Sequence, residues 1–551
     1  MAPIRDISPA RRPPRWLASL AVSLLIFGIG LRFTQLDGKF HWNDEIITAL
    51  RTAGHTIWDF KGSYFDDRII PFSDVQYFQQ IKPGSSFQDT VDGLAVEDAK
   101  HTPLYFVIAR AGRLLFGQFF ETPVAGLRAV SAALSLLIFP SLYWFCRELF
   151  PKLPAVAPVA LGIFALSPVH LLYAQEARAY SLWTAAVLLS SAALLRAMAQ
   201  PSWLRWAGYV GAVTIGIYSQ TLFALVLLSH GGYVLLQGWP HHPKEATQPP
   251  GWWGLPQLWW QFGGAVLGIC MLFLPWIDDI LGTMTMLKAN TGWVTEAIPR
   301  HHVVKQWLVG FSSTLFDWDS LSLVKIVKGT DAWTDYLPQF CVVLGLATAF
   351  IYTLRQAEPR AGRMLLCLVA SPVICLMLPD ILWGGQRSAA PRYWLAAYCA
   401  LQIAVAYVIG FKLSQQKARL WKILLLGIFV VQALSCVRLI QAPIWWNKHF
   451  YNFPAVAEVI NAAPNALVIS DPTGANPGCI IALGELVRPG VDLQLVTPPE
   501  IPPLPEGYGS VFFFDTYGEV YGSLVQLYEA EQGVRAIAAG EGILWQVIPK
   551  A

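Results

Sequence analysis

Eleven long apolar runs constrain this chain more than any other feature of its sequence. A helix needs roughly 20 apolar residues to cross ~30 Å of hydrocarbon, and each run is near that length. Only 14% of the residues are charged, against about 25% in soluble domains. The sequence therefore predicts an all-α polytopic membrane protein with about eleven transmembrane helices. The runs cover residues 16–31, 124–146, 156–174, 180–199, 204–219, 221–238, 259–276, 337–355, 364–380, 392–411 and 421–440.

The basic residues between the runs predict the side of the membrane that each loop occupies. The first run is preceded by Arg5, Arg11, Arg12 and Arg15. No small-residue cleavage site follows it, which indicates a signal anchor with its N-terminus in the cytoplasm. An eleven-span path then places the basic loops at 147–152, 196–205, 355–363 and 412–422 in the cytoplasm together. This path requires a tight reversal between Tyr218 and Thr221. It also requires the segment from His101 to Gly117, which Arg110 and Arg113 interrupt, to lie in the outer interface as an amphipathic helix.

The same path leaves three regions outside the membrane, at 37–123, after Pro275 and from 441 onward. Between Asp37 and His101 there are eleven acidic and six basic residues, the opposite bias from the cytoplasmic loops. After residue 441 the sequence FPAVAEVINAAP predicts a helix, and ALVIS, VDLQLV, SVFFF and ILWQVI predict short strands. We therefore expect a transmembrane domain over 1–440 and a small extracytoplasmic α/β domain over 441–551.

Asp44 and Glu45 form an adjacent acidic pair in HWNDE, soon after the first run. At the start of a helix either carboxylate can point into a cleft, and a carboxylate at the outer surface can accept a proton from an attacking hydroxyl. The same pair is also favoured at a helix N-terminus by the helix dipole alone. Both interpretations stay open on spacing alone.

Glu176 and Arg178 lie in SPVHLLYAQEARAYS, between the third and fourth runs. Ionisable groups at membrane depth are costly unless they are paired or solvated, so a functional role is a reasonable hypothesis beside a structural ion pair. Arg392 and Tyr393, with Arg387, lie in GGQRSAAPRYWLAAY, where an outer loop enters the tenth span. An arginine there can bind a phosphate with its fork of donors, or anchor the helix at the interface.

Lys100 and His101 precede the amphipathic helix, where they can hold a phosphate or simply flank the helix. Metal binding is not expected. His301 and His302 have no ligand partners at a recognisable spacing, and the eight cysteines form no CxxC pair. From the residues alone, the sequence predicts an enzyme or a transporter with a polar cavity at the outer surface.

Three segments in this order resemble the GT-C superfamily, specifically the glycosyltransferase family 39 branch with its protein O-mannosyltransferases and lipid A aminoarabinose transferase. They are HWNDE, HTPLYFVIARAGRLLFG and ALSPVHLLYAQEARAYSLWTAAVLLS. The resemblance covers about residues 16–240 well and the later spans only in general layout. It implies an inverting glycosyltransferase of the plasma membrane that moves a sugar from a polyprenyl phosphate to an acceptor hydroxyl of a protein, glycolipid or polysaccharide.

The resemblance also implies roles for individual residues. Asp44 would be the general base, and Glu45 would shape the site. Glu176 and Arg178 would line the opposite wall, with Arg178 near the donor phosphate and Arg392 a weaker candidate for it. No cofactor is required; a divalent cation is possible, but no DxD triplet indicates one. Relatives often carry a histidine where this chain has Tyr218, Ser219 and Gln220, which puts that contact in doubt.

Two other functions stay open at this point. A flippase for lipid-linked saccharides would need polar or broken helices at the midplane of the membrane. A non-catalytic assembly subunit would not depend on Asp44 or Glu176.

Overall fold

The computed structural model describes residues 13–238, 257–415, 418–448, 452–516, 522–532, 535–540 and 543–548. Arg5, Arg11 and Arg12, on which the orientation partly rests, lie outside these residues. The chain divides into two compact units. The helical unit comprises Met1–Gly38, Asp98–Tyr105 and Arg128–Ala442, and the mixed unit comprises Lys39–Glu97, Phe106–Leu127 and Pro443–Ala551.

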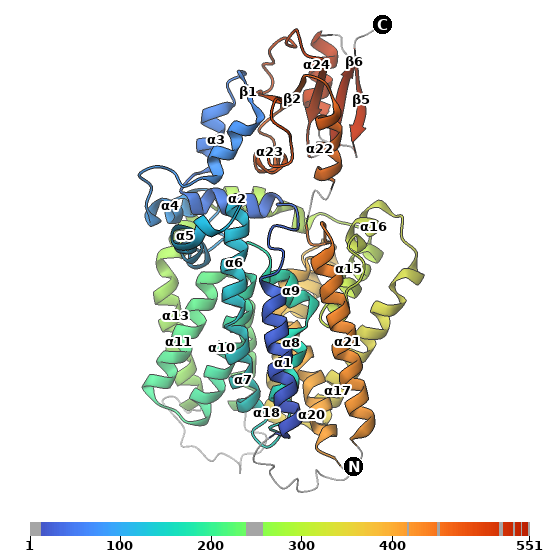
Figure 1. Ribbon diagram of the computed structural model, residues 1–551. Coiled ribbons are helices and arrows are strands. Elements are labelled where there is room, and N and C mark those ends of the chain that lie inside the picture. The colour runs from blue at the N-terminus through green and yellow to red at the C-terminus, as the bar shows by residue number, and fades with distance from the viewer. Residues whose placement is uncertain are drawn as a thin grey trace. The chain divides into compact units, whose positions relative to one another are not determined.

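All eleven apolar runs are helical in the structure, because a chain in hydrocarbon must satisfy its backbone polar groups internally. Figure 1 shows the long helices α1, α10, α13, α17 and α21. The helical unit holds α1 (Arg15–Arg32), α7 (Ile138–Leu149), α8 (Val156–Ala165), α9 (Pro168–Ala174), α10 (Tyr180–Ala199), α11 (Trp203–Ser219), α12 (Ala224–Gly238), α13 (Gln257–Gly282), α14 (Met284–Thr291), α15 (Arg300–Ser312), α16 (Ser322–Lys328), α17 (Leu337–Gln356), α18 (Pro359–Pro372), α19 (Leu378–Trp383), α20 (Leu395–Leu413) and α21 (Arg419–Gln441).

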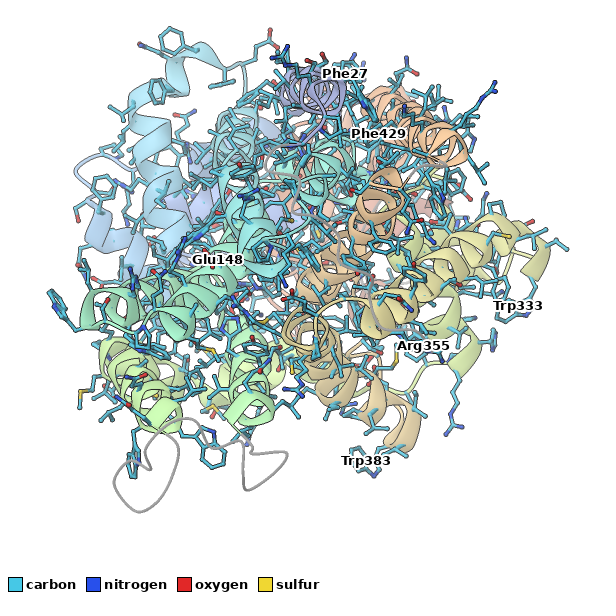
Figure 2. The ribbon with its side chains drawn as sticks, turned by 90° about the horizontal axis from the view of Figure 1, so that it is seen from below. Phe27, Glu148, Trp333, Arg355, Trp383 and Phe429 are labelled. Atoms are coloured by element: carbon cyan, nitrogen blue, oxygen red, sulfur yellow. The ribbon has the colours of Figure 1, made fainter. Side chains whose placement is uncertain are left out.

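The described part of the chain has nine helical stretches that are long and apolar enough to cross a membrane, and α8 with α9 makes a tenth if the bent pair is one span. The remaining predicted run is α11, which has 17 residues. Many apolar side chains on these helices are exposed, and Figure 2 shows Phe27, Trp333 and Trp383 pointing away from the helices. Such surfaces fit lipid rather than water. The chain is a multi-pass membrane protein, as the sequence predicts.

The helix break predicted near Tyr218 is present. α11 ends at Ser219, Gln220 is extended with φ −163° and ψ 128°, and a short 3₁₀ turn, η3 (Thr221–Phe223), leads into α12. Gly216 faces the ring of Phe223, and a β-carbon at Gly216 would lie 2.4 Å from it. The chain therefore turns back against the end of α11 instead of continuing as one long helix.

The third apolar run is broken rather than straight, with a bend of 57° between α8 and α9. Pro168 begins α9, and a proline cannot donate the backbone hydrogen bond that would continue α8. Side chains from other helices satisfy the carbonyl oxygens that the break leaves without partners. Arg32 donates to Phe164 and Ala165, Gln432 to Ile163 and Cys436 to Leu166.

The mixed unit is built around a six-stranded sheet of order β1-β3-β2-β4-β6-β5. β2 pairs in parallel with both β3 and β4, and the other pairs are antiparallel. Its elements are α2 (Asn43–Ala53), α3 (Ile57–Tyr64), β1 (Ile69–Pro71), η1 (Phe72–Gln79), α4 (Phe87–Glu97), α22 (Phe453–Ala462), β2 (Ala466–Ser470), α23 (Asn476–Gly484), β3 (Asp492–Leu495), β4 (Ser510–Phe514), α24 (Gly522–Gln532), β5 (Arg535–Gly540) and β6 (Leu544–Ile548). The helices α5 (Leu104–Phe116) and α6 (Pro123–Ser135) have residues in both units.

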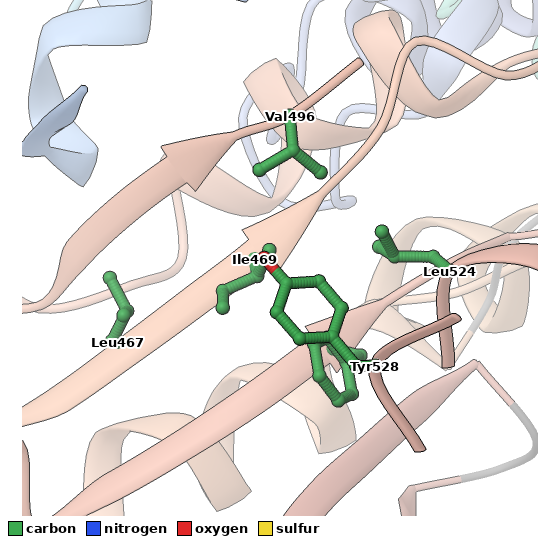
Figure 3. Packing of buried hydrophobic residues seen from close by; sticks show 6 residues of the cluster. Leu467, Ile469, Val496, Leu524 and Tyr528 are labelled. Carbon is green, nitrogen blue, oxygen red and sulfur yellow. The ribbon is translucent and has the colours of Figure 1, made fainter. Parts of the chain in front are cut away.

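The helix and four strands predicted after residue 441 are all present, as α22, β2, β3, β4 and β6. One face of the sheet packs with α24 around a core of Leu467, Ile469, Val496, Phe513, Leu524 and Tyr528 (Figure 3). The expected boundary at 440 lies close to Pro443, where the C-terminal part of the mixed unit begins. The unit also takes up most of residues 37–123, the segment predicted as the first outer loop, and β1 of this segment pairs with β3.

Candidate functional site

Glu176 and Arg178 lie in the turn that joins α9 to α10, and both side chains are buried. The turn is tied to the end of α1 by Gln175, whose amide nitrogen donates to the carbonyl oxygens of Leu31 and Thr34 at 3.0 and 2.8 Å. The backbone N–H of Arg178 donates to the carbonyl of Glu176 at 2.7 Å. The turn is therefore held in place by its own backbone and by a neighbouring helix end.

Arg178 meets His101, so two of the candidate groups are neighbours in the helical unit. The guanidinium Nη2 lies 3.0 Å from Nε2 of His101, and the Asp98 carboxylate lies 3.6 Å from the same ring nitrogen. Lys100 also contacts Asp98, with its Nζ 3.1 Å from Oδ1. Arg178, His101 and Lys100 thus form a linked cluster, in which Arg178 contacts His101 and the Asp98 carboxylate contacts both His101 and Lys100.

The short segment that carries Lys100 and His101 is fixed by two side chains from distant helices. Thr221 donates its hydroxyl to the carbonyl of Lys100 at 3.0 Å, and Trp276 of α13 donates its indole N–H to the carbonyl of Ala99 at 2.9 Å. The helix break at Gln220, which places Thr221, therefore helps to position this cluster.

The structure separates the two arginines of the GGQRSAAPRYW segment by role. Arg387 donates to the buried carboxylate of Asp380 at 2.9 Å, which makes a structural ion pair. Arg392 is half-buried and lies 5.3 Å above the ring of Tyr393. Arg387 thus has a structural partner, and the phosphate-binding role expected of Arg392 stays a prediction.

Asp44 and Glu45 occupy the first turn of α2 in the mixed unit, as expected for a helix start. They differ in environment, because Asp44 is half-buried whereas Glu45 is fully buried. Glu45 forms an ion pair with Lys448, whose Nζ lies 2.5 Å from Oε2. Two charges at this depth are retained only when they are paired. Sequence reasoning missed Lys448, since no local pattern links it to a residue so distant in the chain.

The two arginines within α5 anchor this helix to its neighbours in the mixed unit. Arg110 donates to the carbonyl of Thr52 at 3.2 Å, and Arg113 donates to the carbonyl of Ala49 at 2.8 Å. Burial lowers the pKa of Arg113 to about 10. At the C-terminal end of the helix, directly after Arg113, Leu114, Leu115 and Phe116 are exposed. The predicted helix is confirmed, and its position in the membrane interface stays a prediction.

Among the residues that the structure describes, no group of three or more His, Cys, Asp or Glu side chains is arranged to hold a metal ion. The rings of His301 and His302 lie 4.5 Å apart, edge to face, on α15. The expectation that no metal is required stays a prediction.

No protein-family model matches the sequence, and no curated protein matches it. A solved structure has a similar fold. The crystal structure of ArnT from Cupriavidus metallidurans bound to undecaprenyl phosphate aligns over 96% of this chain and 97% of that one, with a TM-score of 0.53 and 11% sequence identity. The chain has the GT-C fold. The resemblance to this superfamily expected from the sequence is thereby confirmed at the level of the fold.

Two other solved structures align less closely. The oligosaccharyltransferase of Archaeoglobus fulgidus aligns over 88% of this chain and 64% of its own, with 14% identity and a TM-score of 0.47. The mycobacterial arabinofuranosyltransferase AftD aligns over 99% of this chain and 40% of its own, also with 14% identity and a TM-score of 0.47. The GT-C fold assignment rests on the alignment with ArnT.

Proposed function

We propose that this chain is an inverting glycosyltransferase that moves a sugar from a polyprenyl phosphate to an acceptor hydroxyl. The observation that carries the proposal is the GT-C fold, shared over nearly the whole chain with a protein solved with undecaprenyl phosphate. A neighbour at this identity supports the fold, and the chemistry must come from the residues of this chain. We place the reaction at the outer face of the plasma membrane, with the N-terminus in the cytoplasm.

In the proposed reaction, Asp44 is the general base. Its carboxylate takes the proton of the acceptor hydroxyl as that oxygen attacks the anomeric carbon, and the bond from this carbon to the phosphate oxygen breaks. The polyprenyl phosphate leaves with the electron pair of that bond. Because attack and departure occur on opposite faces of the sugar, the anomeric configuration inverts. One base is enough, since a phosphate leaves without prior protonation.

The cluster of Arg178, His101 and Lys100 supports binding of the donor phosphate in this proposal. A guanidinium offers two parallel N–H donors to phosphate oxygens, and buried positive charge stabilises a leaving group as it gains charge. Asp98 keeps the cluster ordered when no phosphate is bound, since it contacts both Lys100 and His101. Arg392 and Tyr393 are second candidates for the same phosphate, and Glu176 for a sugar hydroxyl.

The proposal is tested by donor consumption. The full chain is purified into nanodiscs and supplied with one radiolabelled polyprenyl-phosphate sugar at a time, together with a membrane extract as the source of acceptors. Transfer of label from one donor to an acceptor, with release of free polyprenyl phosphate, is the expected result. Movement of intact labelled donor across the membrane of sealed vesicles that contain the protein, without consumption, would identify a flippase instead. Binding with neither outcome would favour an assembly subunit.

A further inference from the structure

The short segment around Asp44 is held from one side by residues of the C-terminal part of the chain. His41 contacts Glu485, with its Nδ1 2.7 Å from Oε2. Glu45 pairs with Lys448 at 2.5 Å. The Glu45–Lys448 pair is fully buried and the His41–Glu485 contact is partly buried, and both lie entirely within the mixed unit. They fix the chain three residues before Asp44 and immediately after it.

Asn43 makes the third contact, and it is a close packing contact rather than a hydrogen bond. A β-carbon built on Gly478 of α23 would lie 2.1 Å from Oδ1 of Asn43, a distance that no real side chain tolerates. Gly478 lies within α23, and no left-handed backbone requires a glycine there. Alanine is the better helix former by about 1 kcal/mol, so the backbone of α23 gives no reason for a glycine. The close approach of Asn43 does explain why a glycine is needed at position 478.

Lys448 also lies near the residue that precedes α2. Its Nζ lies 6.0 Å from the ring centroid of Trp42, the N-cap residue of α2. The backbone N–H groups of Glu45 and Ile46 both donate to the carbonyl of Trp42, at 2.9 and 3.1 Å. The first turn of α2 is thus held by its own backbone hydrogen bonds and by contacts with Lys448.

Glu485 has a second partner that makes it a fixed point rather than a mobile surface group. The amide of Gln79 donates to Oε1 of Glu485 at 2.7 Å, while Oε2 contacts His41. Burial, and with it the negative charge of Asp44, raises the pKa of Cys479, the residue after Gly478. Helix α23 packs against α2, the helix that carries Asp44.

We propose that the C-terminal segment orients Asp44, and that Lys448, Gly478 and Glu485 are positioning residues for this carboxylate. None of them needs to touch substrate. Their role is to fix residues 41, 43 and 45, so that the side chain of Asp44 keeps one direction. The inference rests on the proposed function for the role of Asp44 in transfer, but the contacts on which it depends can be measured without activity.

Gly478→Ala tests the proposal with the smallest possible change. The added methyl must displace Oδ1 of Asn43 and press on Cδ1 of Ile47, and we expect the first turn of α2, which carries Asn43, to shift with them. A displacement of about 1 Å lowers a catalytic rate on the order of 100-fold, so we expect kcat to fall by that order while KM for the donor stays within about twofold. Gly478→Ala with Asn43→Ala removes the clash and restores kcat. Gly62→Ala, a helical glycine of the same unit with nothing within 4 Å, is the matched control.

Hydrogen exchange of the backbone amides of Glu45 and Ile46 is the second readout, measured on the full chain in nanodiscs. We expect faster exchange in Gly478→Ala, and wild-type exchange in the double variant and in Gly62→Ala. Unchanged exchange in Gly478→Ala overturns the positioning contact, whether or not any donor is consumed. Faster exchange with an unchanged kcat overturns the link between this contact and Asp44. A wild type that consumes no donor counts against the proposed function alone, because the exchange result still decides the contact.

Discussion

Glu45 and Lys448 lie 403 residues apart in the sequence, and their side chains form a fully buried ion pair with 2.5 Å between Nζ and Oε2. Removing one partner leaves the other charge buried and alone, which costs about 3–5 kcal/mol. We therefore expect Glu45→Met and Lys448→Met each to lower the thermal unfolding midpoint strongly. The double variant should recover most of the loss, since an apolar pair of similar volume needs no compensating charge. A double variant as unstable as either single variant would contradict this account.

Arg32 supports the break between α8 and α9. Its guanidinium donates to the carbonyls of Phe164 and Ala165, and it is fully buried. Arg32→Met leaves both oxygens without these donors, at about 1–3 kcal/mol for each unsatisfied buried group. We expect a clear drop in the unfolding midpoint in detergent, and none for the exposed Arg15→Met. Equal unfolding midpoints for Arg32→Met and wild type would show that other groups satisfy these two carbonyl oxygens.

His55 should make the mixed unit sensitive to mild acid. Its ring is buried against Tyr77 and Phe78. Burial first, and then the charges of Lys82 and Arg113, lower the pKa of His55 below its ordinary value of 6.5. Below pH 6.5 the unfolded chain therefore binds a proton at His55, whereas the folded chain keeps this ring neutral to a lower pH. The stability contributed by the neutral ring is present above pH 6.5 and is lost as the pH falls below it.

The measurement for His55 is the unfolding midpoint between about pH 7.5 and pH 5.5, the interval around the unfolded pKa. His55→Gln should flatten the decline. His301→Gln, at an exposed histidine, should leave it unchanged. An equally steep decline in His55→Gln would assign the acid sensitivity to another group.

Arg178→Lys separates charge from geometry in the proposed phosphate site. Lysine keeps the positive charge but loses the planar fork that binds phosphate with two parallel hydrogen bonds. The loss of one charge-assisted hydrogen bond, about 1.5–3 kcal/mol, corresponds to a rise in KM for the donor of roughly 10-fold or more. Arg387→Lys, which changes the structural pair with Asp380, should affect stability and leave KM unchanged. The reverse pattern would move the phosphate site to Arg387.

The sequence predicted most of the fold, because a helix that crosses a bilayer needs a long apolar run, and such a run is visible in the local composition. The apolar runs became helices, and the short apolar segments ALVIS and SVFFF became β2 and β4. The strand β1 was missed because its three residues are defined by pairing with the distant β3 and not by a local pattern. The helix break at Pro168 was missed. A proline often marks the end of a helix, but the run around Pro168 is apolar and was therefore interpreted as one continuous span.

The site was predictable only in part, for a related reason. Asp44, Glu176, Arg178 and His101 stand out as ionisable groups beside apolar runs. Their partners do not, since Lys448 and Asp98 become meaningful only through contacts that the folded chain creates. Sequence alone could not show that Arg387 pairs with Asp380, because that contact depends on the folded chain.

The most direct test of the account is the release of polyprenyl phosphate from the radiolabelled donor by wild type and by Asp44→Asn, in nanodiscs with a membrane extract. Asp92→Asn, at an exposed carboxylate of the same Lys39–Glu97 segment, is the control. We predict that wild type and Asp92→Asn release polyprenyl phosphate and transfer the sugar, and that Asp44→Asn binds the donor, unfolds at the wild-type temperature and transfers nothing. Wild-type transfer by a folded Asp44→Asn protein would contradict the central claim that Asp44 is the base.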